Sequence, residues 1–325
     1  MTGSEVFGEL DNDTIFCSGA FCTADVVQLN SSLANIARQP GLTSFAFDCS
    51  GSETEVRRDW LLAVSSALSG MPELASLYAS LGFMSTDDYS IGDDLPDFIS
   101  GALAAAPSLS NLTLDAIMSG VGDQNAEALG KAISSGALSF VALNLRLNDE
   151  GDVQDYLTGE GTRDLVVALG KASSLQELVL VLEQCVDVGA EGMSAVGDAL
   201  AVEDSFPQLR QLTLNMETTV NDDACGDDRT ICNEALTNLG TGLNALSAKG
   251  LDSLVLRLGA NRYDEDGEAL FAAQLQCAID RGLEVPDFTD KCECDLIFDE
   301  NSNCLKRNGG DDEACFVCNS TTGRL

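Results

Sequence analysis

Leu175-Gln176-Glu177-Leu178-Val179-Leu180 is followed, after eight other residues, by Gly189-Ala190-Glu191-Gly192-Met193-Ser194-Ala195-Val196-Gly197-Asp198-Ala199-Leu200. The first stretch has apolar residues at its first, fourth and sixth positions. The related stretch Leu143-Asn144-Leu145-Arg146-Leu147 alternates apolar and polar residues, which is typical of a strand with one buried face. In the second stretch Met193, Val196, Ala199 and Leu200 recur at helical spacing. These residues predict a short strand followed by an amphipathic helix.

The strand motif recurs along the chain. It is found at Leu42-Phe45-Phe47, Leu74-Leu77-Ala79, Leu109-Leu112-Leu114, Phe140-Leu143-Leu145, Leu175-Leu178-Leu180, Leu209-Leu212-Leu214 and Leu251-Leu254-Leu256. Successive motifs start 32, 35, 31, 35, 34 and 42 residues apart. Repeats of this length indicate stacked strand–helix units, because one unit cannot bury its own apolar face. A repeated strand and helix predicts a parallel sheet with helices on its far side.

The strand motif resembles the leucine-rich repeat, and the helix half, with Ala-Leu closing the helix, resembles the ribonuclease-inhibitor-like subfamily. The resemblance covers residues 42–285 and implies a right-handed α/β solenoid with its parallel sheet inside and its helices outside. The family usually places Asn or Cys three residues after the second strand Leu. In this chain Asn148 alone fits, among Ser50, Gly82, Ile117, Asn148, Glu183, Glu217 and Gly259.

Three regions are predicted from this pattern and from the cysteines. Residues 1–41 form an N-terminal cap with a helix through Val26 to Ala37, and residues 42–285 form a solenoid of about seven units. Residues 286–325 form a small cysteine-rich C-terminal cap. Caps are expected because terminal repeats expose an apolar edge.

The charge and the absence of histidine exclude several functions. Lys and Arg total 17 against 53 Asp and Glu, for a formal net charge of −36, which disfavours nucleic acid and anionic membranes and favours cations or basic surfaces. Without histidine, Ser-His-Asp and Cys-His catalysis are excluded. Carboxylates are so abundant that no catalytic pair stands out, so we expect no enzyme and no catalytic residues.

The residues between the buried strand positions are the candidates for binding. They alternate with the leucines and therefore point out of the core, onto the concave face of the sheet. Either the face binds a partner, or it is a solvated sheet whose open side uses residues that favour strands. The candidates are Tyr78, Thr113, Asp115, Asn144, Arg146, Val179, Val181, Glu183, Thr213, Asn215, Val255 and Arg257.

Acidic loops give a weaker expectation of Ca²⁺ binding, since Ca²⁺ is held by six to eight oxygen ligands. Asp264 and Asp266 come before a Gly at a plausible offset, but Arg262 opens this stretch and Ala273 stands where the closing Glu of an EF-hand belongs. Solvated acidic loops are the favoured interpretation. No other cofactor is expected.

Twelve cysteines, many of them near the ends, suggest disulfides and an oxidising compartment. Cys17 and Cys22 are expected to staple the N-terminal cap, and Cys225 and Cys232 to close an insert loop. The C-terminal candidates are Cys277, Cys292, Cys294, Cys304, Cys315 and Cys318. A zinc site of Cys292, Cys294, Cys315 and Cys318 is the alternative there.

The remaining sequence features concern the compartment. N-glycosylation sequons occur at Asn12, Asn30, Asn111 and Asn319. Residues 1–10 show no signal-peptide pattern, and no run approaches the roughly 18 apolar residues of a membrane span. We therefore expect a non-enzymatic protein-binding scaffold in an extracellular or luminal compartment. The alternative is a structural subunit of an extracellular or organelle-surface assembly, such as a filament or wall, that self-assembles with possible help from Ca²⁺.

Overall fold

A computed structural model describes most of the chain. The described residues are 7–11, 14–18, 21–22, 24–39, 41–50, 58–82, 91–148, 156–220, 230–259, 261 and 263–284. The expectations for the C-terminal cap, for Asn12, Asn319 and Cys225, and for the five cysteines beyond Cys277 fall outside these residues.

Nine strands form one sheet in which each strand pairs with its neighbours in chain order. β1 is antiparallel to β2, and β2 to β9 are parallel with each strand in register with the next. Each of the seven predicted motifs contains one strand. The strands are β1 (Phe7–Asp11), β2 (Thr14–Ser18), β3 (Ser44–Asp48), β4 (Ser76–Ser80), β5 (Asn111–Asp115), β6 (Phe140–Asn144), β7 (Glu177–Val181), β8 (Gln211–Asn215) and β9 (Ser253–Arg257).

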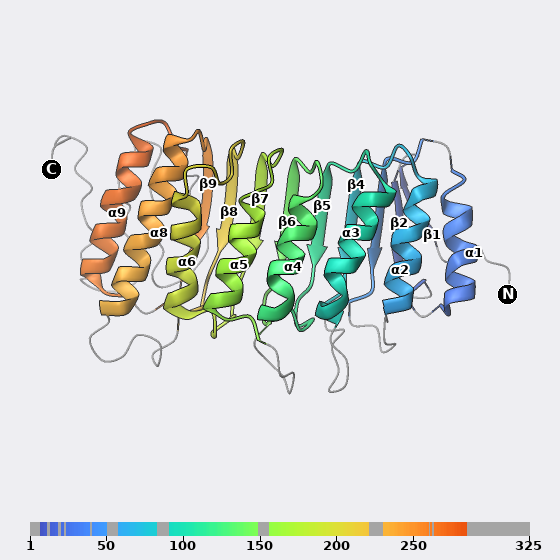
Figure 1. Cartoon of the computed structure of the whole chain (residues 1–325), viewed down its shortest axis with the longest axis horizontal. Coiled ribbons are helices and arrows are strands. Elements are labelled where there is room, and N and C mark those ends of the chain that lie inside the picture. Colours follow the sequence, from blue (N-terminus) through green and yellow to red (C-terminus); the bar gives the residue numbers. More distant parts are fainter. Residues whose placement is uncertain are drawn as a thin grey trace.

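Helices alternate with the strands and lie side by side in one layer over one face of the sheet, along the length of an elongated body (Figure 1). The expected helix through Val26 to Ala37 is α1. The helices are α1 (Val26–Ile36), α2 (Arg58–Ala67), α3 (Leu95–Ala105), α4 (Asp123–Ser134), α5 (Gly159–Leu169), α6 (Gly189–Ala201), α8 (Thr230–Ala248) and α9 (Glu265–Ile279). Two 3-10 turns, Leu68–Gly70 and Ile91–Asp94, precede β4 and α3.

The core lies between the sheet and the helix layer. Alternate strand residues such as Leu112, Leu178 and Leu212 are buried there, together with the apolar stripe of each helix. Near the amino end, Phe21, Phe47 and Trp60 replace the leucines with a contiguous aromatic cluster, with ring centroids 5.3 to 6.2 Å apart. The sheet therefore has one buried face and one face without a helix in the described part of the chain, which we call the open face.

The register corrects one predicted motif. Asn111 pairs with Phe140 and Leu112 pairs with Val141, so Phe140 lies on the open face and is not a core residue. The buried residues of this unit are Leu138, Val141, Leu143 and Leu145. The predicted motif was placed two residues late because Phe140 is apolar and has leucines at the same offsets.

The burial pattern also corrects the expectation that Asn148 alone fits the family's Asn or Cys position, because Cys185 and Asn261 fit it too. A buried residue able to hydrogen-bond stands three residues after the last buried position of each of five strand segments: Ser119, Asn148, Cys185, Thr219 and Asn261. Asn148 Oδ1 accepts hydrogen bonds from the backbone N–H groups of Ser119 and Val121 at 3.1 and 2.9 Å, and Nδ2 donates to the carbonyls of Ala116 and Leu145 at 2.8 Å. We call these five residues the polar ladder.

Asn261 repeats this arrangement three units further along the chain, after β9. Its Oδ1 accepts from the N–H of Val220 at 2.9 Å, and its Nδ2 donates to the carbonyls of Met216 and Leu258 at 2.7 and 2.9 Å. Buried backbone groups need such partners, because an unmade hydrogen bond costs the full desolvation of the group. The polar ladder therefore lets successive loops stack closely at the carboxyl ends of the strands.

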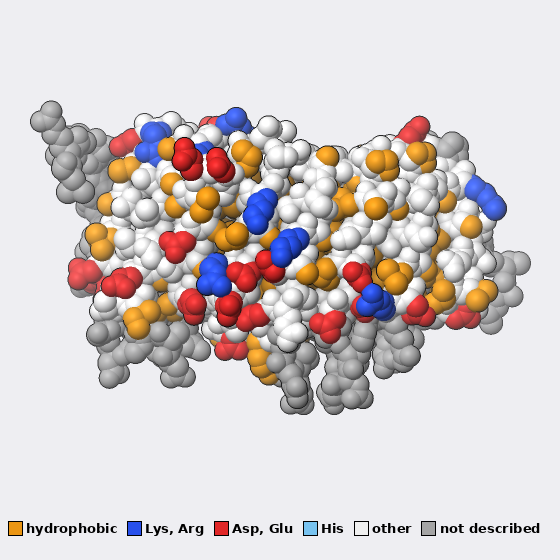
Figure 2. All heavy atoms as spheres, in the orientation of Figure 1, with side chains coloured by type: hydrophobic (Ala, Val, Ile, Leu, Met, Phe, Trp, Pro, Cys, Tyr) orange, Lys and Arg blue, Asp and Glu red, His pale blue; other side chains and the backbone are white. Residues whose placement is uncertain are grey.

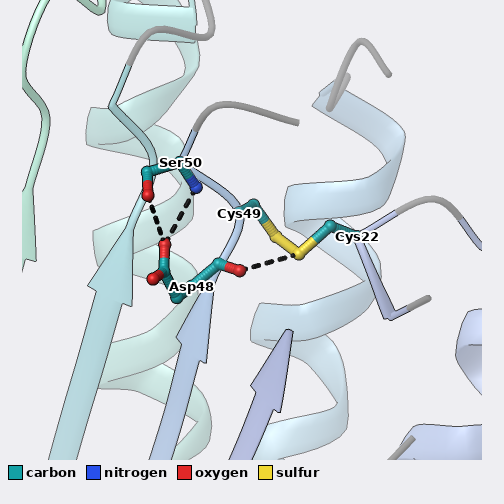
Figure 3. The surroundings of a disulfide bond; sticks show 4 residues. All are labelled: Cys22, Asp48, Cys49 and Ser50. Carbon is teal, nitrogen blue, oxygen red and sulfur yellow. Dashed lines mark hydrogen bonds between the residues drawn. A yellow bond between two sulfur atoms is a disulfide. The ribbon is translucent and has the colours of Figure 1, made fainter. Parts of the chain in front are cut away.

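The cysteine predictions are partly wrong. Cys22 pairs with Cys49, which immediately follows β3, and not with Cys17 (Figure 3). Cys17 is a free, buried thiol, and burial raises its pKa to about 12. Cys277 is a free, exposed thiol on α9, so it is not in the expected disulfide. Cys232 is disulfide-bonded, as expected.

The Cys22–Cys49 disulfide ties the segment before α1 to the end of β3. Cys22 Sγ lies 3.2 Å from the carbonyl oxygen of Asp48. The Asp48 carboxylate accepts hydrogen bonds from the N–H and the hydroxyl of Ser50, at 3.0 and 2.6 Å (Figure 3). The bond therefore fixes the first unit to a turn that is already ordered by side-chain contacts.

Candidate functional site: the open face of the sheet

The in-register strands arrange the open-face side chains in rows that cross the sheet. The middle row is Ala46, Tyr78, Thr113, Ala142, Val179, Thr213 and Val255. The row at the carboxyl ends is Asp48, Ser80, Asp115, Asn144, Val181, Asn215 and Arg257. Ten of the twelve predicted face residues occupy these two rows. The other two, Arg146 and Glu183, follow the ends of their strands.

The third row, at the amino ends of the strands, was missed in the sequence. It is Ser44, Ser76, Asn111, Phe140, Glu177, Gln211 and Ser253. Each of these residues comes one position before a buried strand residue, and alternation alone places it on the open face. This signal was present in the sequence, but the prediction counted only residues between two buried positions.

The open face is hollowed along this third row. A depression of about 550 Å³ extends from Ser44 on β3 to Gln211 on β8, and its lining includes Tyr78 and Thr113 of the middle row. Six successive strands thus contribute to one continuous hollow. Its size falls in the range of known ligand sites, although it is open to solvent along the sheet.

Charged side chains that follow β6 and β7 on the open face pair with each other. Arg146 Nη2 lies 3.3 Å from Glu183 Oε1 and donates to Gln184 Oε1 at 3.2 Å. Asn215 Nδ2 donates to the other Glu183 oxygen at 3.1 Å. Arg257, by contrast, is exposed and has no ion-pair partner among the described residues. The two arginines that the sequence singled out therefore differ, and Arg257 is the one available to a partner.

Asp115 is held in an environment that disfavours its charge. Burial raises the pKa of this carboxyl, and the neighbouring charge of Asp48 raises it further, while hydrogen bonds from Ser80 and from the N–H of Ile117 lower it. Ser80 Oγ donates to Asp115 Oδ2 at 3.4 Å, and Asp115 Oδ1 is buried without a partner.

Replacing Asp115 by Asn is expected to raise the melting temperature near neutral pH by a few degrees. The raised pKa means that the folded chain prefers the protonated carboxyl. The stabilisation from Asp115 is therefore present below the ordinary pKa of an aspartate and is lost as the pH rises through the raised value. The variant should lose its advantage at low pH, where the native carboxyl is also neutral. Equal melting temperatures at neutral pH would contradict the assignment.

The remaining predicted sites are dispersed. Asn30 is exposed on α1, whereas Asn111 is half-buried on β5 and donates to Ser76 Oγ at 3.1 Å. Asp264 is the N-cap of α9 and accepts from the N–H groups of Asp266 and Gly267 at 3.0 and 3.2 Å. Its carboxylate is thus used by the helix, and the described residues contain no group of three or more metal-binding side chains.

The described residues of the helix-covered side include a smaller hollow. Figure 2 shows that acidic and basic side chains on this side are interspersed with hydrophobic and neutral ones. A smaller depression of about 320 Å³ lies among α5, α6 and α8 and is lined by Glu191, Asp198, Glu234 and Arg163. Arg163 already pairs with Glu160 and Asp164.

Comparison with known proteins found no protein family whose sequence pattern matches the chain and no curated protein similar to it. No helix in the described part of the chain is long and apolar enough to cross a membrane.

Proposed function

We propose that this chain is a right-handed leucine-rich-repeat solenoid of the ribonuclease-inhibitor-like type, and that it binds another protein through the open face of its sheet. The observation that carries this proposal is the set of three in-register rows with a hollow across six strands. Such a face combines apolar, aromatic and polar side chains, the mixture found in protein interfaces. A scaffold of this kind needs no catalytic group.

An extracellular or luminal location completes the proposal. The Cys22–Cys49 disulfide is compatible with an oxidising compartment, where such bonds persist. The exposed Asn30 sequon on α1 lies on an element of the helix layer, so a glycan there leaves the open face accessible. With a net charge of −36, the chain favours partners with neutral or basic contact surfaces.

Site-specific photo-crosslinking tests the proposal. A photoreactive amino acid at Thr113, in the middle row, is expected to capture a partner in the native secretory or extracellular fraction. The same amino acid at Val167, a helix-layer side chain that is 42% exposed, is the matched control and should capture none. Capture from Val167 with none from Thr113 would overturn the assignment of the open face.

A further inference from the structure

The hollow of the open face is neutral in a chain that is strongly acidic. Its row at the amino ends of the strands supplies Ser44, Ser76 and Asn111 on three successive strands, and Gln211 on β8. Glu177 and Arg210 are the charged residues of the lining. The guanidinium of Arg210 donates to the carbonyl of Gly250 at 2.7 Å and is therefore already engaged.

Two aromatic side chains stand among these polar groups. Tyr78 of β4 is 36% exposed, and Phe140 of β6 is half-buried. They come from the two strands that flank β5, which contributes Asn111 and Thr113 between them. Phe140 is not part of the buried core, and aromatic faces combine a large apolar surface with a fixed geometry for a ligand.

Several polar side chains of the hollow have no hydrogen-bond partner among the described residues. Asn111 and Ser76 bond each other, and Ser139 Oγ donates to the carbonyl of Ser110 at 3.2 Å. The side chains of Ser44, Thr113, Gln176 and Gln211, by contrast, make no hydrogen bond within the described part of the chain. Uncharged donors and acceptors thus point to a ligand that is itself neutral and rich in hydrogen-bonding groups.

We propose that the hollow binds a neutral oligosaccharide carried by the partner protein. Hydroxyl groups of a glycan suit the hydroxyl and amide side chains, and the apolar faces of its sugar rings suit Tyr78 and Phe140. The strands are about 4.8 Å apart, close to the length of one sugar unit, so each strand can offer one polar side chain to each unit. This inference rests on the proposed use of the open face.

Other ligand classes fit this hollow less well. Nucleic acids and anionic glycans are repelled by a net charge of −36. An extended peptide gains affinity mainly by pairing with a free strand edge. Here the backbone groups of β3 to β8 already pair with strands on both sides. A neutral glycan can be bound through side chains alone, without backbone pairing, and the hollow presents such side chains.

Calorimetric titration with neutral hexasaccharides tests the inference, using cellohexaose, laminarihexaose, maltohexaose and chitohexaose, with hexagalacturonate as the anionic control. At least one neutral probe is expected to bind, and hexagalacturonate is not. Tyr78→Ala should weaken that binding by about tenfold, because it removes an aromatic contact surface. Gln211→Ala removes an exposed side chain of the same hollow, so it tests glycan binding independently of Tyr78. Leu62→Ala, on the helix layer, should bind as the native protein does.

The outcomes separate this inference from the proposed function. If none of the neutral probes binds, or if Tyr78→Ala and Gln211→Ala both bind as the native protein does, the glycan inference fails. Capture of a partner from Thr113 would still support protein binding in that case. If Thr113 captures the partner equally well when the glycans have been removed enzymatically before irradiation, the inference fails while the proposed function stands. Loss of capture after deglycosylation supports both.

Discussion

Replacing Asn148 by Ala is expected to lower the free energy of unfolding by about 3 kcal/mol or more. The Asn148 side chain is buried and hydrogen-bonds to five backbone groups, two N–H donors and three carbonyl acceptors, in its own unit and the preceding one. Alanine removes the acceptor of the Ser119 and Val121 N–H groups in a space closed to solvent. The carbonyls of Ala116 and Leu145 keep their hydrogen bonds from Ser119 Oγ and Cys185 Sγ. Each buried group that loses its partner costs roughly 1–3 kcal/mol, and local relaxation recovers only part of this.

Urea denaturation followed by circular dichroism measures this effect. Asn144→Ala is the matched control, because Asn144 is the same residue type in the same unit but lies half-exposed on the open face. We expect the control to change stability by less than about 0.5 kcal/mol. If both variants unfold at the same urea concentration, the polar ladder contributes no more than any surface amide.

Replacing Gly242 by Val is expected to destabilise the chain by about 3 kcal/mol. Gly242 lies on α8, and a Cβ atom there would overlap the backbone carbonyl of Gly197 on α6. Gly197 in turn approaches the backbone of Asn238, so the two helices touch through their main chains. A side chain at this contact forces the helices apart and opens the core beneath them.

Thr241→Val is the control for this variant, since Thr241 is the adjacent, exposed residue of α8. It places the same valine side chain at the neighbouring, exposed position of the same helix, where it replaces a residue that is already β-branched. Thermal unfolding should show a large loss for Gly242→Val and a small change for Thr241→Val. A comparable loss in both would mean that valine destabilises α8 at either position, and that the contact between α6 and α8 does not explain the effect.

The sequence predicted the repeating units well because burial of alternate strand residues leaves a direct signal. Seven strands and the helix α1 lie where the pattern placed them. The unit at Phe140 shows the limit of such counting, because an apolar residue on the open face imitates a core position. The same shift of two residues concealed the polar ladder. Counting from the predicted motifs placed only Asn148 at the position expected for Asn or Cys.

Contacts between distant residues were not predictable in this way. Cys49 lay within the pattern of the first repeat, and nothing in its spacing marked it as the partner of Cys22. The hollow was missed because it depends on which face-row residues meet across six strands. Gly197 and Gly242 are 45 residues apart in sequence, and their contact depends on how α6 packs against α8. The presence of a glycine alone does not indicate such a contact.

Strands in this protein contact the strands before and after them in chain order, and the helices do the same. Folding therefore resembles a one-dimensional chain of coupled units, in which a break at one interface need not melt the whole molecule. Hydrogen exchange should then decrease from the end units toward the middle of the sheet. A partner that spans several units would bind them together and raise their cooperativity, so binding across the hollow would be detectable as slower exchange in units it never touches.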